Sequence, residues 1–117
     1  MIAASMNARV AVTVALLILS LNGSHATGEN DRAHTVAKQN ACLGCHANNK
    51  KIVGPSFQDI AAKYKNNPDA NAFLKNKIQK GGAGSWGVVP MPSNPKLSDA
   101  ELAILLPWIL RGAPSKD

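Results

Sequence analysis

Apolar residues recur at helical spacing in four stretches of the chain, and no stretch alternates apolar and polar residues over the length of a strand. The first predicted helix begins at the capping residues 30–31 and runs toward Ala41, with Ala33, Val36 and Ala37 on one side. This pattern predicts an all-α fold in a single small domain.

Two shorter helices are predicted in the middle of the chain. Ser56 and Asp59 form a capping-box pattern, which predicts a helix that ends near Lys65. The next helix is predicted to have Pro68 in its first helical position and to stop at residues 81–82. Its apolar stripe consists of Ala70, Phe73, Leu74 and Ile78.

The last predicted helix opens at a capping box formed by Ser98 and Glu101, and Gly112 ends it. Pro107 falls inside this helix, where a proline removes one main-chain hydrogen bond and costs about 3 kcal/mol. We therefore expect a kink at Pro107, with the helix resuming through Leu110. The apolar face of this helix consists of Leu102, Leu105, Leu106 and Ile109.

Two stretches carry no helical signal. Residues 45–55 are polar and end in a Gly-Pro pair, whereas residues 81–95 contain four glycines and three prolines. Long loops in a compact domain are usually either functional or disordered. The second loop is therefore a candidate for functional residues.

The N-terminal region has the pattern of a secretory signal peptide. Arg9 precedes an apolar run over residues 10–21, and residues 24–26 form a small-x-small cleavage pattern. This run spans about 18 Å as a helix, which is short of the ~30 Å hydrocarbon core of a bilayer. We predict that residues 1–26 are a cleaved signal peptide and that residues 27–117 form a mature periplasmic domain. A retained N-terminal anchor is the alternative.

The predicted mature region is small, basic and poor in aromatic residues. It has twelve basic and seven acidic side chains, which gives a formal charge of +5. Only 4% of the chain is aromatic, so some other large apolar body is needed to fill the core. The basic residues are spread out and lack interleaved aromatic residues, and this pattern argues against nucleic-acid binding. The charge indicates either a solvated surface or steering toward an acidic protein partner.

Cys42, Cys45 and His46 form the pattern C-x-x-C-H, the attachment motif of a c-type haem. Two thiols at this spacing can add to the two vinyl groups of a haem as thioethers. The adjacent imidazole can then bind the iron as its proximal ligand. We therefore predict one covalently attached haem c.

The motif has three other interpretations, and the sequence favours none of them. A thioredoxin-like site needs strands around the C-x-x-C pair, and none is predicted. A zinc site needs four ligands, and only His34 remains in the mature region to complete Cys42, Cys45 and His46. A disulfide across two residues would close a very small loop and stabilise little.

Met91 is the predicted sixth ligand of the haem iron. It lies between Pro90 and Pro92 in the glycine-rich loop, where the prolines stiffen the main chain and remove two hydrogen-bond donors. Such a segment has no helix or sheet of its own and can hold a thioether in one place. His34 is the alternative ligand.

Beyond the haem motif, nearly the whole mature region resembles the class I cytochromes c of the small bacterial cytochrome c-551/c-552 type. The resemblance implies a cytochrome c fold with four to five short helices around one haem, in a monomeric electron carrier with His46 and Met91 on the iron. The segments that carry it are Cys42-x-x-Cys45-His46, 53–64 (VGPSFQDIAAKY), 77–78 (KI), 81–87 (GGAGSWG), 90–94 (PMPSN), 97–99 (LSD) and Trp108.

The resemblance also implies roles around the haem for four further residues. The Pro55 carbonyl would accept the ring N–H of His46 and so fix its orientation. Trp86 would donate its indole N–H to a haem propionate, with Lys77 nearby. Asn94 would form a hydrogen bond near the sulfur of the methionine ligand.

Two departures from the family pattern bear on the contact between the first and last helices. Val36 stands where the family commonly has an aromatic residue, which predicts a looser contact. Pro107 interrupts the usual last helix and makes the position of Trp108 hard to predict.

Two protein ligands leave no open position on the iron, so we predict electron transfer rather than an enzyme with its own substrate. The haem edge near Lys50 and Lys51 would exchange electrons with the acidic surface of a reductase, oxidase or dehydrogenase, without nucleic acid or stable membrane insertion. A haem enzyme or gas-binding protein with a labile sixth ligand is one alternative. A redox or metal-binding module without haem is another.

Overall fold

Four α-helices and one short 3-10 turn are the helical elements of residues 25–115, the part of the chain that the computed structural model describes. Two isolated bridges are the only strand-like pairings in this part of the chain, so the predicted all-α class is confirmed. The predicted signal peptide lies outside the described residues, except for its last two positions. The elements are α2 (His25–Gln39), η1 (Cys42–Gly44), α3 (Phe57–Tyr64), α4 (Ala70–Lys80) and α5 (Asp99–Leu110).

Helix α2 begins at His25, so the prediction that residues 30–31 cap the first helix is wrong. Both residues lie inside α2, and Asn30 contacts the residue that follows α5. Arg111 Nη2 donates to Asn30 Oδ1 at 3.2 Å and lies 3.9 Å from Glu29 Oε1. These contacts join exposed side chains and link the early turns of α2 to the end of α5.

Ser56 and Ser98 cap α3 and α5, as predicted. Ser56 Oγ accepts a hydrogen bond from the N–H of Asp59 at 3.0 Å. Ser98 Oγ accepts one from the N–H of Glu101 at 3.2 Å, and the Glu101 carboxylate accepts the N–H of Ser98 at 2.9 Å. The predicted capping box is therefore complete.

The start of α4 differs from the prediction, because the helix begins at Ala70 and Pro68 lies before it. Asn67 Oδ1 accepts the N–H of Asp69 at 2.9 Å, and this side-chain turn leads the chain into the helix. At the other end, Gly81 stops α4 as predicted, with a φ of 68° that favours glycine.

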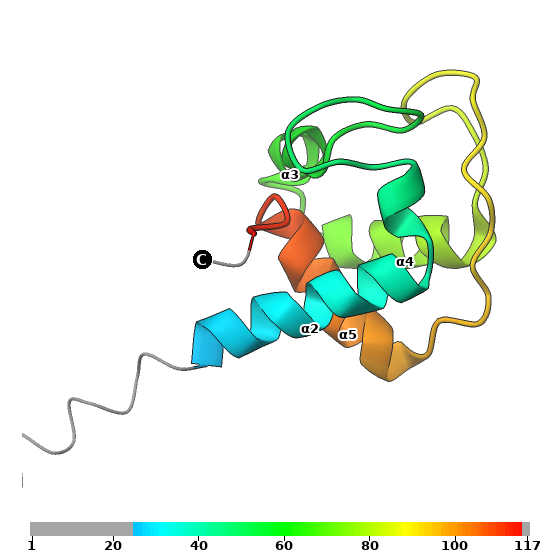
Figure 1. Ribbon diagram of the computed structural model, residues 1–117. Coiled ribbons are helices and arrows are strands. Elements are labelled where there is room, and N and C mark those ends of the chain that lie inside the picture. Colours follow the sequence, from blue (N-terminus) through cyan, green and yellow to red (C-terminus); the bar gives the residue numbers. More distant parts are fainter. Residues whose placement is uncertain (1–24, 116–117) are drawn as a thin grey trace, which may run out of the picture.

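Helix α5 continues past Pro107 to Leu110, as predicted, while the kink at Pro107 stays a prediction. Helix α5 crosses α2 (Figure 1). The two helices approach through the fully buried small residues Ala33 and Ala37. Trp108 is also fully buried, and its indole N–H donates to the carbonyl of Pro114 at 3.1 Å. Trp108 is thus held in the core although it follows a proline.

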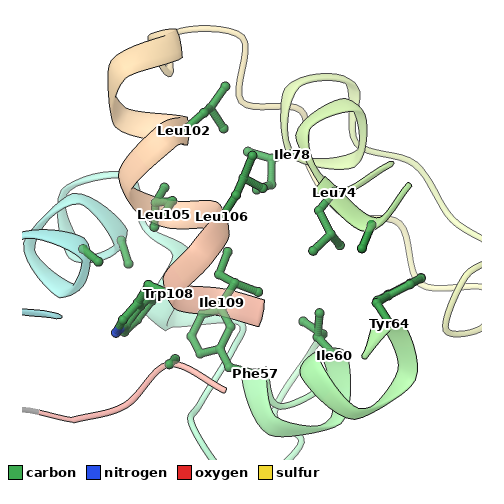
Figure 2. Packing of buried hydrophobic residues seen from close by; sticks show 14 of the residues in the cluster. Phe57, Ile60, Tyr64, Leu74, Ile78, Leu102, Leu105, Leu106, Trp108 and Ile109 are labelled. Atoms are coloured by element: carbon green, nitrogen blue, oxygen red, sulfur yellow. The ribbon is translucent and has the colours of Figure 1, made fainter. Parts of the chain in front are cut away.

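The core gathers on one side of α3, α4 and α5 (Figure 2). Phe57 lies at its base. The centre of its ring is 5.2 Å from that of the Trp108 ring and 5.4 Å from that of the His46 ring, on which it stacks. Phe73 was predicted in the apolar stripe of α4, but it is 39% exposed and contacts the ring of Tyr64 at the edge of the core. Phe73 therefore lies at the border of the core rather than inside it. No helix within residues 25–115 is long and apolar enough to cross a membrane.

Candidate functional site

A mostly apolar cavity lies among α3, α4, the segment after the C-x-x-C-H motif and the loop 81–95. Apolar cavities with a few polar groups in their walls commonly hold a small molecule or a cofactor. Four of the predicted site residues outside the loop line it: Cys45, His46, Pro55 and Lys77. From the loop, Trp86 and Met91 complete the wall.

The two cysteines lie around the 3-10 turn η1, which follows directly on α2. Ala41 precedes the turn with a φ of 59°, so the chain reverses sharply before Cys42. Both thiols are free and half-buried, which disagrees with a disulfide. Burial is the main cause that raises the pKa of the Cys42 thiol, with a smaller contribution from Cys45. A thioredoxin-like site needs a lowered pKa, so the structure disfavours that interpretation too.

His46 is oriented by the main chain and by close packing. Its Nδ1 lies 2.7 Å from the carbonyl oxygen of Pro55, as the resemblance implies. Because a carbonyl can only accept, Nδ1 carries the proton, and Nε2 keeps a lone pair that can bind a metal. Gly54 lies against the ring: a Cβ at this position would come within 2.5 Å of His46 Cε1. A glycine is therefore required here for the imidazole to fit.

Met91 is held by a pair of hydrogen bonds that the sequence analysis did not predict. Its N–H donates to the carbonyl of Gly82, and the N–H of Gly82 donates to the carbonyl of Met91, both at 2.9 Å. The segment has no helix or strand of its own, as predicted, but this isolated bridge fixes its main chain. Gly81 lets the two arms of the loop approach each other, because a Cβ there would overlap the Met91 carbonyl.

Of the other predicted residues, Trp86 and Lys77 line the same cavity, whereas Asn94 does not. Trp86 is 43% exposed and stands at the cavity wall, and the Lys77 side chain approaches Gly82. Asn94 Nδ2 donates to the carbonyl of Asn40 at 3.3 Å, which links the loop to the end of α2. The haem contacts predicted for these residues remain predictions.

Sequence reasoning missed Lys63, the last basic residue of α3. Its Nζ lies 4.3 Å from the centre of the Trp86 ring and 2.5 Å from the carbonyl oxygen of Ser85. No motif identifies such a contact, because it joins residues more than twenty positions apart.

The donor groups around the cavity suit a haem better than a bare metal ion. The thiol of Cys45, an imidazole nitrogen and a thioether border an apolar cavity, and the free thiol of Cys42 lies three residues before Cys45; these are the groups that hold a c-type haem. In residues 25–115 no three His, Cys, Asp or Glu side chains gather as a metal site, which argues against the zinc alternative.

Comparison with known proteins agrees with this chemistry. Residues 31–112 match the family model of cytochrome c. The chain is 48% identical over 75 residues to cytochrome c-552 of Nitrosomonas europaea, a match that covers 64% of this chain and 73% of the relative. It is 45% identical over 73 residues to cytochrome c-551 of Pseudomonas denitrificans, covering 62% of this chain and 88% of the relative.

Solved structures of other proteins are also similar to the fold of this chain. The crystal structure of wild-type Nitrosomonas europaea cytochrome c552 matches with a TM-score of 0.64 and 46% identity, over 68% of this chain and 98% of that one. The class 1 cytochrome MtoD from Sideroxydans lithotrophicus ES-1 matches with a TM-score of 0.63 and 31% identity, over 72% of this chain and 96% of that one. The predicted fold is therefore confirmed.

Proposed function

Since the chain belongs to the cytochrome c family and so transfers electrons through one covalently attached haem c, we propose that His46 and Met91 hold the haem iron and that the protein is a single-electron carrier of the periplasm. Cys42 and Cys45 would form the thioether bonds. In this proposal residues 1–26 are the signal peptide that directs export, and residues 27–117 are the working domain.

The observation that carries the proposal is the arrangement of the two side chains on one cavity. His46 offers Nε2, because its Nδ1 is committed to the carbonyl of Pro55 at 2.7 Å. Met91 borders the same cavity from the loop 81–95 and is fixed there by its two hydrogen bonds to Gly82. With a firmly positioned imidazole and a firmly positioned thioether as its two axial ligands, the haem iron would have no open coordination position for a substrate.

When bound, the haem supplies a one-electron couple between ferric and ferrous iron. The residues of the chain then set how easily the electron is accepted. A thioether ligand favours ferrous iron and raises the reduction potential. The apolar wall around the cavity also favours the less charged, reduced site.

We further propose that the rim of the cavity is the face on which redox partners dock. Val53 and Val89 border the cavity and are 51% and 62% exposed. The exposed lysines Lys50 and Lys51 precede this apolar rim in the sequence. A partner reductase, oxidase or dehydrogenase with acidic groups around an apolar patch would fit, in a brief and small contact between monomers.

Steering of this kind depends on salt. We expect the second-order rate of electron exchange with an acidic redox protein to fall steadily as the ionic strength rises, because screening shortens the range of the attraction. Stopped-flow measurement of that rate at several salt concentrations tests this, and a flat profile would contradict it.

Replacement of Met91 tests the ligand set. In Met91→Ala we expect the sulfur–iron charge-transfer band of the ferric protein to vanish and the midpoint potential to fall, because the thioether is gone. Val88→Ala is the matched control, since Val88 belongs to the same loop but is 91% exposed. An absorption spectrum and a potentiometric titration give both results, and a band that persists in Met91→Ala would mean that another group binds the iron.

Carbon monoxide distinguishes the carrier from the alternative of a gas-binding protein or haem enzyme. We expect the reduced wild-type protein to bind carbon monoxide slowly and weakly, and Met91→Ala to bind it readily, because only the variant has an open position. Fast, tight binding by the wild-type protein would overturn the carrier function in favour of that alternative.

A further inference from the structure

The loop 81–95 forms one wall of the cavity, yet few contacts hold its middle in place. Its glycines Gly84 and Gly87 have φ values of 104° and 111°, and the N–H of Gly84 donates to the carbonyl of Gly87 at 2.8 Å. The pairing of Gly82 with Met91 fixes the base of the loop rather than its tip. Trp86 is 43% exposed, so packing alone does not fix its ring.

Lys63 supplies a contact at this point. It lies in the last turn of α3, which is anchored in the core by Ile60 and Tyr64. Its ammonium group donates to the carbonyl of Ser85 at 2.5 Å and lies 4.3 Å from the centre of the Trp86 ring. One side chain thus binds two consecutive residues of the loop, and both of these line the cavity.

We propose that Lys63 is a positioning residue for the haem site, holding Ser85 and Trp86 against α3 so that the loop stays closed over the cavity; this rests on the proposed function. A charged donor makes a stronger hydrogen bond to a carbonyl than a neutral one, and an ammonium group is attracted to the face of an indole ring. Lys63 therefore combines two contacts that a neutral side chain of the same length lacks.

The position of the charge adds a second consequence. A cation fixed beside the cavity wall favours the reduced form of the site, because that form carries one positive charge fewer. A lysine that only keeps the surface soluble would move freely and would have no effect beyond that of any other lysine nearby. A positioning lysine and a merely solubilising lysine therefore predict different results when Lys63 is replaced.

Three variants separate the roles. Lys63→Leu removes both contacts and the charge, whereas Lys63→Arg keeps the charge, a donor for Ser85 and a group that stacks on Trp86. Lys65→Leu is the matched control. Lys65 is an exposed lysine two positions further along the chain, and its replacement removes the same charge.

Amide hydrogen exchange of the haem-containing protein reports the closure of the loop. We expect the Gly84 amide to exchange on the order of tenfold faster in Lys63→Leu than in the wild-type protein, and unchanged in Lys63→Arg and Lys65→Leu. Equal exchange in Lys63→Leu and Lys65→Leu would overturn the proposal.

The midpoint potential is the second measurement, and a purely structural contact far from the haem would not move it. We expect a larger drop in Lys63→Leu than in Lys65→Leu, with recovery in Lys63→Arg; equal drops in the two leucine variants would contradict the proposal. If the wild-type protein lacked the sulfur–iron band, the proposed ligand set would fail, but the exchange experiment would still decide the role of Lys63.

Discussion

Main-chain groups, rather than side-chain partners, orient both predicted iron ligands. The carbonyl of Pro55 accepts from His46, and Gly82 exchanges two hydrogen bonds with Met91. Main-chain groups belong to the loops themselves, so each ligand keeps its direction only while its loop keeps its shape. The glycines that permit these loop shapes are therefore needed for the correct orientation of the ligands.

Gly54 offers a test of this dependence. Gly54→Ala would place a Cβ 2.5 Å from His46 Cε1, far below van der Waals contact, so either the ring or the loop must shift. We expect a loss of about 1–3 kcal/mol in the free energy of unfolding, the usual cost of overpacking. The spectrum of the haem should change as well, because the imidazole moves.

Gly44 is the control for this substitution. It lies between the two cysteines, and a Cβ there would meet nothing within 4 Å. Gly44→Ala should therefore leave both the spectrum and the unfolding midpoint in denaturant nearly unchanged. If both alanine variants behaved alike, contact with His46 would not be the reason for glycine at Gly54.

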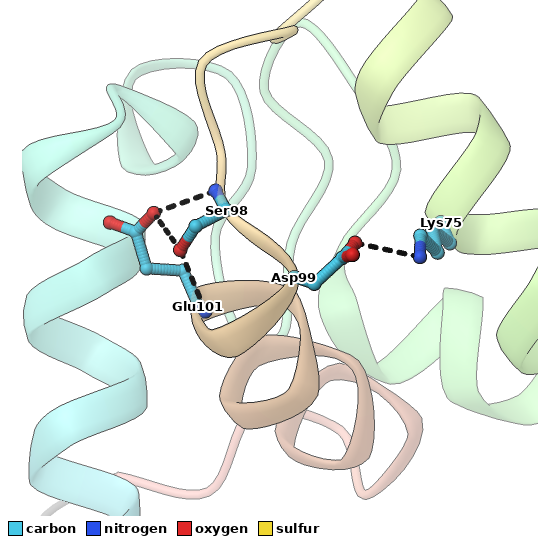
Figure 3. A network of polar contacts seen from close by, with 4 residues as sticks. All are labelled: Lys75, Ser98, Asp99 and Glu101. Carbon is cyan, nitrogen blue, oxygen red and sulfur yellow. Dashed lines mark hydrogen bonds and ion pairs between the residues drawn. The ribbon is translucent and has the colours of Figure 1, made fainter.

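At the scale of elements, the N-terminus of α5 combines the capping box with an ion pair (Figure 3). Hydrogen bonds from Ser98 lower the pKa of the Glu101 carboxyl, first through the main-chain N–H and then through the hydroxyl. Lys75 of α4 lies 2.8 Å from Asp99 and lowers the pKa of that carboxyl. Asp99 is 82% exposed, so this pair adds little to stability.

The lowered pKa of Glu101 fixes the sign of its pH dependence. Its contribution to stability is present above the ordinary pKa of 4.5 and is lost as the pH falls through the lower pKa of the folded state. We expect Glu101→Gln to show a smaller loss of stability than the wild-type protein on going from pH 7 into this acid range. Denaturant unfolding at several pH values measures it, and parallel curves would contradict the assignment.

Ser98→Ala complements this variant, since it removes the hydroxyl but keeps the main-chain N–H. It should cost about 1 kcal/mol at neutral pH, as loss of a helix cap usually does. The acid dependence should persist in part, because the N–H of Ser98 still binds Glu101.

The elements show which signals are local and therefore readable from sequence. The capping residues Ser56 and Ser98 act on residues three positions away, and both were predicted correctly. The start of α2 was predicted wrongly. This part of the helix contacts Arg111, a residue that is far away in the sequence. The prediction that Pro68 lies inside α4 was also wrong. The Asn67 side chain forms a turn with Asp69, and this turn takes the place of the first helical residues.

At the scale of the whole molecule, the candidate site joins segments that the sequence separates. The C-x-x-C-H motif and Met91 could be singled out from residue types and spacing alone. Their common cavity could not, because its walls come from segments far apart in the chain, such as Ser85, which Lys63 of α3 contacts. Spacing along a chain identifies which groups can hold a haem, but only the fold brings them to one cavity.

The cavity also explains how a chain with so few aromatic residues forms a stable domain. Phe57, Tyr64 and Trp108 are buried, and Tyr64 also lines the cavity, which adjoins this core. An unfilled apolar cavity costs free energy, and small domains have little stability to spare. The haem would therefore serve as the second half of the core.

Removal of the attachment points tests this last step. In Cys42→Ala/Cys45→Ala, prepared without haem, we expect no cooperative thermal unfolding, because the walls of the cavity lose the body that they pack against and the loop 81–95 has too few contacts to close alone. Circular dichroism and calorimetry on this protein and on the haem-containing wild type make the comparison. A sharp transition in the haem-free variant would mean that the core on the α5 side folds without the haem, and the small size of the domain would then need another explanation.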